Sequence, residues 1–219
     1  MRSSLATIVN LSPNFNPRGS RRVTRITPHF VVGQLPAQTV ANMPKFKDAH
    51  IASANYIIGK DGEILCNVEE ENRAWTSDSR SNDYSAITIE CASDLEPPYT
   101  FNDKVRKSLV DLLIDICSRY NKCGIVIANN EEQAQLMEAG YQHFFVITYH
   151  RFFAKVECPG QWLVDNMPLI AEEVNKALTD NTWYKVQVGA FKEKSNAERL
   201  RDKLRDEGYD DAFIVETIN

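Results

Sequence analysis

The stretch Ala86-Ile87-Thr88-Ile89-Glu90-Cys91 decides the fold class, because small or polar residues alternate with apolar ones along it. Alternation with a period of two is typical of a β-strand whose two faces meet different surroundings. It places Ala86, Thr88 and Glu90 on one face and leaves the other face apolar. We therefore expect a strand of a larger sheet at residues 86–91.

Strands and helices interleave on both sides of this stretch. Further strands are expected at 23–30, in a hairpin over 55–68, at 125–127 and at 144–149. Apolar residues at helical spacing predict helices from Asp103 through Ile116 and over 162–178, with a short helix at 131–139. This order predicts an α/β fold, with a central mixed β-sheet flanked by helices.

Two details of this fold are less regular. Pro28 interrupts the run 23–30, which suits a strand end or a strand at the edge of the sheet. Residues 72–85 are polar around a lone Trp75 and are expected to form a long loop. Trp75 either lines a groove or caps the core, and the pattern leaves both open.

A second pattern begins after a polar boundary at 179–182. Residues 183–191 alternate, a helix is expected from Ser195 until Gly208, and 213–215 supplies a second strand. We expect two domains, 1–178 and 183–219, the second a small β-α-β unit. About 37 residues is marginal for an independent core, so the unit should dock on the main domain or pair with another copy.

Composition excludes several classes of protein. The 219 residues are 43% hydrophobic and carry a formal net charge of −5, which argues against a nucleic-acid partner. No apolar run resembles a signal peptide or could span a bilayer, so we expect synthesis in the cytoplasm and no membrane partner. The five cysteines form no Cys-x-x-Cys pair, which indicates a reducing compartment.

The strongest site signal in the sequence is His150 followed eight residues later by Cys158. A histidine at a strand end and a cysteine in a Cys-Pro-Gly loop can direct an imidazole and a thiolate to one point, and zinc accepts both. A catalytic zinc needs a third protein ligand, for which His29 is the best candidate. The alternative is that Cys158 is a small buried hydrophobe and His150 a hydrogen-bonded strand-end residue.

Four ordered motifs within residues 20–170 carry a family resemblance. They are His29, the segment from Ser53 to Ile64, the segments Asn72-Arg73-Ala74-Trp75 and Tyr84–Glu90, and the loop His150–Gly160. Together they resemble the zinc-dependent N-acetylmuramoyl-L-alanine amidases, which share a superfamily with phage lysozyme-type amidases and peptidoglycan recognition proteins.

The resemblance implies a function and a site. The family cleaves the amide between N-acetylmuramic acid and the L-alanine of the stem peptide. Its ligands match His29, His150 and Cys158, which would bind Zn²⁺, and its catalytic glutamate matches Glu90. Many relatives carry a lysine two residues before the last ligand, where this chain has Val156; Lys155 is offset by one residue and is assigned no role. Thr76 also departs from the residue usual in relatives.

The tail resembles a SPOR domain in Trp183–Phe191, Ala197–Leu200 and Gly208-Tyr209. That family binds peptidoglycan glycan strands, and a full domain has two β-α-β units where this chain shows one. The half-domain would bind the cell wall as it stands, form a homodimer through exposed strand edges, or serve only as a stabilising appendage.

The predicted function is therefore a peptidoglycan hydrolase that acts on the cell wall after release from the cell, as a phage endolysin or a bacterial autolysin. Its expected partners are the glycan strand and stem peptide of peptidoglycan. One alternative is a recognition module of the same fold that binds peptidoglycan without cutting it. Another is an unrelated zinc hydrolase or a structural zinc protein, which would normally show four protein ligands.

Overall fold

The computed structural model describes residues 2–48, 51–179, 187–209 and 212–216. The chain divides into two compact units, Met1–Thr182 and Trp183–Asn219. Each unit is considered by itself.

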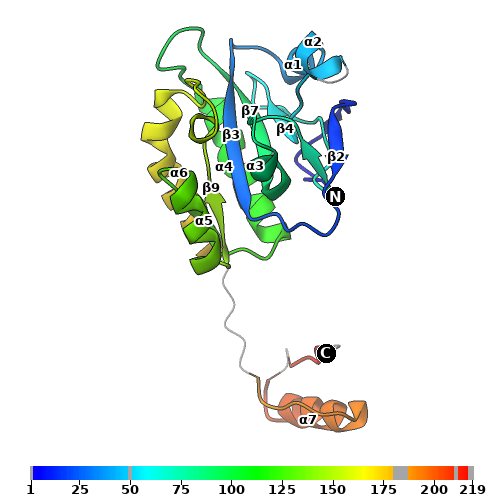
Figure 1. Ribbon diagram of the computed structural model, residues 1–219. Helices are drawn as coiled ribbons and strands as arrows, with labels where there is room; N and C mark the ends of the chain where they lie inside the picture. The colour runs from blue at the N-terminus through cyan, green and yellow to red at the C-terminus, as the bar shows by residue number, and fades with distance from the viewer. Residues whose placement is uncertain (1, 49–50, 180–186, 210–211, 217–219) are drawn as a thin grey trace. The chain divides into compact units, whose positions relative to one another are not determined.

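The first unit is built on a sheet of seven strands (Figure 1). In spatial order they are β1 (Ile8–Val9), β5 (Ile64–Cys66), β4 (Tyr56–Ile58), β7 (Ala86–Ser93), β3 (Arg25–Val32), β9 (Phe144–Ile147) and β8 (Gly124–Ile127). Neighbouring strands are parallel except β4 and β5, which form the predicted hairpin. The prediction of a central mixed sheet is confirmed.

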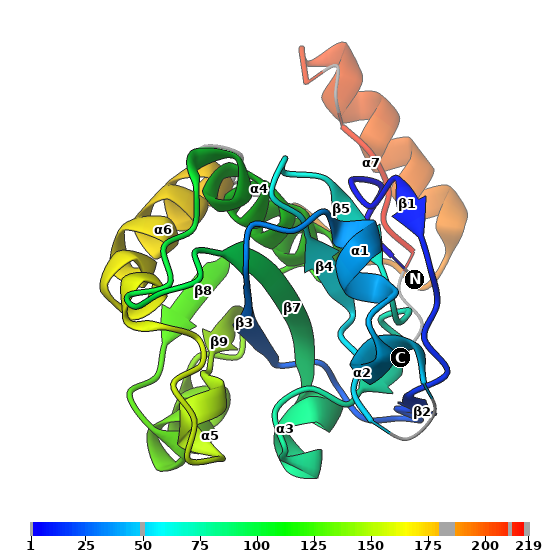
Figure 2. The same cartoon turned by 90° about the horizontal axis from the view of Figure 1, so that it is seen from above.

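Helices cover both faces of this sheet, as Figure 2 shows from above. One face packs against α4 (Asp103–Arg119) and α6 (Gln161–Thr179), and the buried apolar side chains between them form the largest core cluster. The other face carries α1 (Ala37–Ala41), α2 (Pro44–Lys47), α3 (Arg80–Ser85) and α5 (Glu131–Gly140). The predicted stripe from Val105 to Ile116 is fully buried in α4.

The expectation that Pro28 marks a strand end or an edge strand is wrong, because Pro28 is the fourth of the eight residues of β3. Strand β3 lies inside the sheet, paired with β7 along its whole length. Its ladder to β9, however, covers only Arg25 and Ile26. Pro28 therefore lies where β3 is paired on one side only, and a residue without an N–H group is tolerated there.

The predicted long loop over 72–85 contains regular structure. Residues Asn72–Ala74 form β6, which pairs antiparallel with β2 (Phe15–Pro17), and α3 follows at Arg80–Ser85. The helix begins where the Ser79 hydroxyl accepts a hydrogen bond from the backbone N–H of Asn82. A capping serine in a run of polar residues is enough to start a short helix without an apolar stripe.

The described residues of the second unit form the helix α7 (Lys194–Asp206), near the predicted position. Its predicted strands are not formed in the described residues: 187–191 and 212–216 are irregular, and 183–186 lie outside them. Its apolar side chains Val188, Tyr209, Phe213 and Val215 remain at least 60% exposed. A strand needs a partner for its backbone groups and an apolar surface for one face, and so few residues supply neither.

The sequence also predicted that no segment spans a membrane and that the cysteines are reduced. Among the described residues, no helix combines the length and the apolar character needed to cross a membrane. The five cysteines are all free, and all except Cys123 are buried.

Candidate active site

The pairing of the two central strands brings the first two predicted site residues together. In the parallel ladder between β3 and β7, His29 lies directly opposite Glu90. Partners in a parallel ladder direct their side chains to the same face of the sheet. The sequence placed each of them at the end of its strand, but each is the fifth residue of eight, because β3 and β7 continue to Val32 and Ser93. Both are nearly inaccessible, with 1% of His29 and 7% of Glu90 exposed.

The loop after β9 brings the other two predicted residues to the same place. The sequence predicted His150 at the end of a strand, but β9 ends at Ile147 and His150 opens a short 3-10 helix, His150–Phe152. The backbone N–H of Arg151 donates to the Cys158 carbonyl at 3.1 Å, which closes the loop. Cys158 Sγ lies 3.3 Å from His29 Nδ1, and the two histidine rings are 5.1 Å apart.

The predicted ligands His29, His150 and Cys158 offer a ligand set that suits zinc. Their candidate ligand atoms all lie within 4.8 Å of one another. Two imidazole nitrogens and one thiolate are ligands that zinc prefers, and three protein ligands leave a fourth position for water. Glu90, the ladder partner of His29, has its Oε2 buried without a hydrogen-bond partner.

Burial controls the ionisation of the site. It raises the pKa of the Glu90 carboxyl from 4.5 to about 7, against the opposing charge of Lys45. Burial, followed by the charges of His150 and Lys45, lowers the pKa of His29 well below 6.5. Burial and the nearby Glu90 raise the pKa of the Cys158 thiol. His29 is therefore in the neutral form that binds metals, and Glu90 exchanges a proton near neutral pH.

Two neighbours of the site were not identified from the sequence. Asp78 Oδ2 lies 3.3 Å from His150 Nε2, across 72 residues of chain. Lys45 is an exposed residue of α2 whose positive charge reaches both His29 and Glu90. Neither lies in a sequence pattern that marks a site. Only the folded chain brings them to the ligands.

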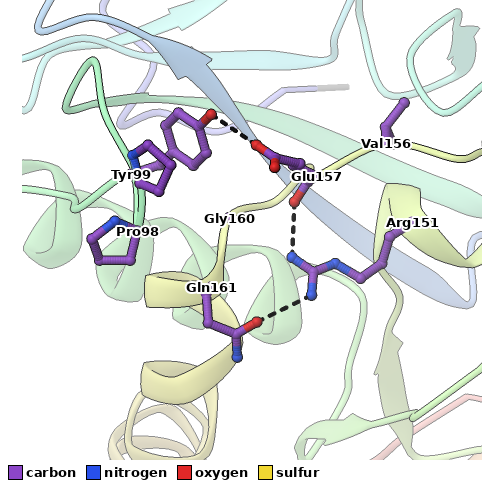
Figure 3. Close-up of a pocket in the computed structure, with 8 residues that line it drawn as sticks. Pro98, Tyr99, Arg151, Val156, Glu157, Gly160 and Gln161 are labelled. Carbon is purple, nitrogen blue, oxygen red and sulfur yellow. Dashed lines mark hydrogen bonds between the residues drawn. The ribbon is translucent and has the colours of Figure 1, made fainter.

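The loop of His150 and Cys158 also borders a cavity of about 350 Å³. Figure 3 shows Arg151 between Glu157 and Gln161, with Tyr99 across the cavity. Arg151 donates to the Glu157 carbonyl at 2.8 Å and to Gln161 Oε1 at 3.4 Å, and the Tyr99 hydroxyl donates to Glu157 Oε2 at 2.8 Å. The bond to Gln161 ties the loop to the start of α6, and the bond from Tyr99 ties it to the segment before α4.

The structure also shows the surroundings of the residues that depart from the family pattern, and of Trp75. Val156 lines this cavity, and Lys155 is exposed. Thr76 Oγ1 donates to the Ser53 carbonyl at 2.6 Å, so its hydroxyl is used within the fold. Trp75 is half-buried and donates from Nε1 to Asn16 Oδ1 at 2.8 Å.

Comparisons with known proteins agree with this fold. The profile of the N-acetylmuramoyl-L-alanine amidase family matches residues 19–161, and that of the SPOR domain matches residues 176–219. The solved structure of PlyL is 16% identical, with a TM-score of 0.52 over 76% of this chain and 95% of that one. The selenomethionine derivative of AmpD is also 16% identical, with a TM-score of 0.53 over 80% and 94%. No curated protein sequence matches the chain significantly.

This fold and these matches define the class of protein: an α/β enzyme that degrades peptidoglycan. The amidase profile covers more than half of the chain, so the chain belongs to the N-acetylmuramoyl-L-alanine amidase family. A SPOR domain follows the amidase region in the sequence.

Proposed function

We propose that this amidase cleaves the bond between N-acetylmuramic acid and L-alanine with a zinc ion held by His29, His150 and Cys158. The observation that carries the proposal is the convergence of their ligand atoms within 4.8 Å, beside the buried carboxyl of Glu90. Zinc held there would lower the pKa of a bound water toward about 7 and polarise the scissile carbonyl. A phage endolysin and a bacterial autolysin would both use this reaction.

Glu90 moves the proton in this mechanism. Its Oε2 has no hydrogen-bond partner, so it is free to accept the proton of the attacking water. The same carboxyl then returns the proton to the leaving nitrogen of L-alanine. Burial raises the pKa of this carboxyl in the metal-free chain, which moves it from the ordinary range of a glutamate toward the range that suits proton transfer in both directions.

His29 and Cys158 prepare the site for a cation. Burial keeps the His29 imidazole neutral, so no proton competes for its ligand nitrogen. The Cys158 thiol, whose pKa burial raises, releases its proton when a metal binds, as ligation by a thiolate requires.

The second unit supports binding to the same polymer. We propose residues 1–178 as the catalytic domain and 183–219 as a half SPOR domain that holds glycan strands, either alone or as a homodimer. The exposed apolar side chains Val188 and Val215 are consistent with a second copy as the partner.

Digestion of purified peptidoglycan, followed by mass spectrometry, tests the zinc mechanism. We expect new L-alanine amino termini that disappear with a zinc chelator and return when zinc is added. Cys158→Ala should abolish both cleavage and zinc binding. Cys123→Ala removes the exposed cysteine outside the site and should retain both.

The alternative outcomes separate the remaining functions. Cleavage that persists after complete removal of zinc would contradict the metal mechanism. Retention on the wall material without cleavage in the presence of zinc would favour the recognition module.

A further inference from the structure

The second nitrogen of His150 has a defined acceptor. Asp78 Oδ2 lies 3.3 Å from His150 Nε2, and this pair joins the loop before α3 to the loop that carries Cys158. A neutral imidazole has one N–H and one lone pair, so a carboxylate that accepts the N–H from one nitrogen leaves the lone pair on the other. The contact therefore selects one tautomer of His150.

The turn that presents Asp78 is fixed by buried hydrogen bonds. The Asp83 carboxylate is 3% exposed and accepts from the backbone N–H of Thr76 at 3.1 Å and of Ser77 at 3.2 Å. It also accepts from the Ser77 hydroxyl at 2.5 Å. On the other side of Asp78, Ser79 caps α3. The residues on either side of Asp78 are therefore both fixed by hydrogen bonds, Ser77 to Asp83 and Ser79 to the start of α3.

The backbone of Asp78 has an uncommon conformation. Its φ is +54°, in the left-handed region where aspartate, asparagine and glycine are the residues best tolerated. The side chain is 76% exposed, so packing does not explain why the chain bends there. The bend does direct the carboxylate to His150.

We propose that Asp78 is a positioning residue for the zinc site: it accepts a hydrogen bond from His150 Nε2–H and thereby leaves Nδ1 of His150 free to bind the metal. The inference rests on the proposed function, because it needs His150 to be a ligand. A carboxylate behind a ligating histidine fixes the ring orientation and increases the basicity of the ligating nitrogen. Asp78 itself would touch neither metal nor substrate.

Two substitutions separate the effect of the Asp78 carboxylate from the effect of its backbone conformation. Asp78→Gly keeps the positive φ and removes the acceptor, whereas Asp78→Asn keeps both the conformation and one acceptor oxygen. We expect the zinc affinity of the full chain, measured by competition with a chromogenic chelator, to fall by about 10- to 100-fold in Asp78→Gly. Asp78→Asn should lose less. Asp111→Asn, which removes an exposed carboxylate of α4 that pairs with Lys107, should retain the wild-type affinity.

A second measurement reports on the bond directly. In ¹⁵N NMR of the zinc-loaded chain, we expect a slowly exchanging proton on His150 Nε2. That proton should exchange faster in Asp78→Gly and stay protected in Asp78→Asn, which a loss of general stability would not produce. Should Asp78→Gly fail to fold, the exchange rate in the wild type and in Asp78→Asn still tests the proposal.

The outcomes distinguish this inference from the function on which it rests. A wild-type chain that binds no zinc would refute the metal site and the inference together. A wild-type chain that binds zinc, with an Asp78→Gly variant of equal affinity or a His150 proton on Nδ1, would refute the positioning role alone.

Discussion

The two faces of the central sheet carry opposite kinds of side chain on the same two strands. On the face covered by α4 and α6, strands β3 and β7 contribute Ile26, Ile87, Ile89 and Cys91 to the main apolar core. On the other face they contribute Thr27, His29, Thr88 and Glu90, which are also buried. One face removes apolar surface from water, while the other holds polar groups that cost free energy to bury.

The polar face is stable because most of its groups bond to one another. Thr27 and Thr148 share a hydrogen bond of 2.8 Å, and Asn82 bonds to both hydroxyls. Among the described residues of β3 and β7, the buried side-chain atoms without a partner are His29 Nε2 and Glu90 Oε2. Unsatisfied buried groups are rare in native proteins, and here both belong to residues of the proposed zinc site.

Removal of the Glu90 carboxylate should have the largest effect on activity. We expect Glu90→Gln to lower kcat by about 10²- to 10⁴-fold, because the glutamine cannot accept the proton of the attacking water. The free energy of unfolding should not fall, since the variant removes a buried charge. Hydrolysis of a soluble muropeptide and chemical denaturation measure the two quantities. A loss of bound zinc along with activity would instead indicate that Glu90 helps to hold the metal.

A substitution on the apolar face should lower the free energy of unfolding and leave kcat unchanged. Leu109 of α4 is fully buried, and Leu109→Ala should lower the free energy of unfolding by about 2–5 kcal/mol through lost burial and a cavity. Urea denaturation measures the loss, and kcat should be retained at urea concentrations where the variant is folded. Leu169→Ala is the matched control, because Leu169 of α6 is 60% exposed. A drop in kcat of the folded Leu109 variant would show that the two faces are coupled.

The apolar face was also the easier one to predict. The helical stripe of α4 and the alternation of β7 are local patterns, and both elements lie where those patterns place them. Strands β1 and β2 have two and three residues, too few for any period, and the sequence did not indicate them. The tail shows the converse: alternation at 183–191 predicted a strand, but its described part, 187–191, is irregular and has no partner strand.

The site depended on information that no local pattern contains. By pattern alone Glu90 belongs to a solvated polar face, and only the family motifs assigned it a catalytic role. Its burial follows from the pairing of β7 with both β3 and β4. The contact between His150 and Asp78 depends on a turn that Asp83 fixes from within the fold. Bonds between distant polar residues leave no period in a sequence, so the supporting residues were missed.

The pH dependence of stability gives the smallest and most specific test of the polar face. The pKa of Glu90 is raised by burial from 4.5 to about 7, so between these values the folded chain binds a proton that the unfolded chain has released. Stability from this group is therefore present below about pH 4.5 and is lost as the pH rises to about 7. This change in the pKa of Glu90 corresponds to about 3 kcal/mol of stability.

Comparison of wild type with Glu90→Gln isolates this contribution in the zinc-free chain. His29, whose pKa burial lowers, gives stability a slope of opposite sign, because its protonated form is favoured in the unfolded chain at acid pH. That slope is common to both proteins and cancels in their difference. Denaturation at a series of pH values should show the wild type losing stability relative to Glu90→Gln from pH 4.5 to 7, and no further change above pH 8. Parallel curves would mean that the Glu90 carboxyl titrates as it does in water, and that the polar face around it is open to solvent.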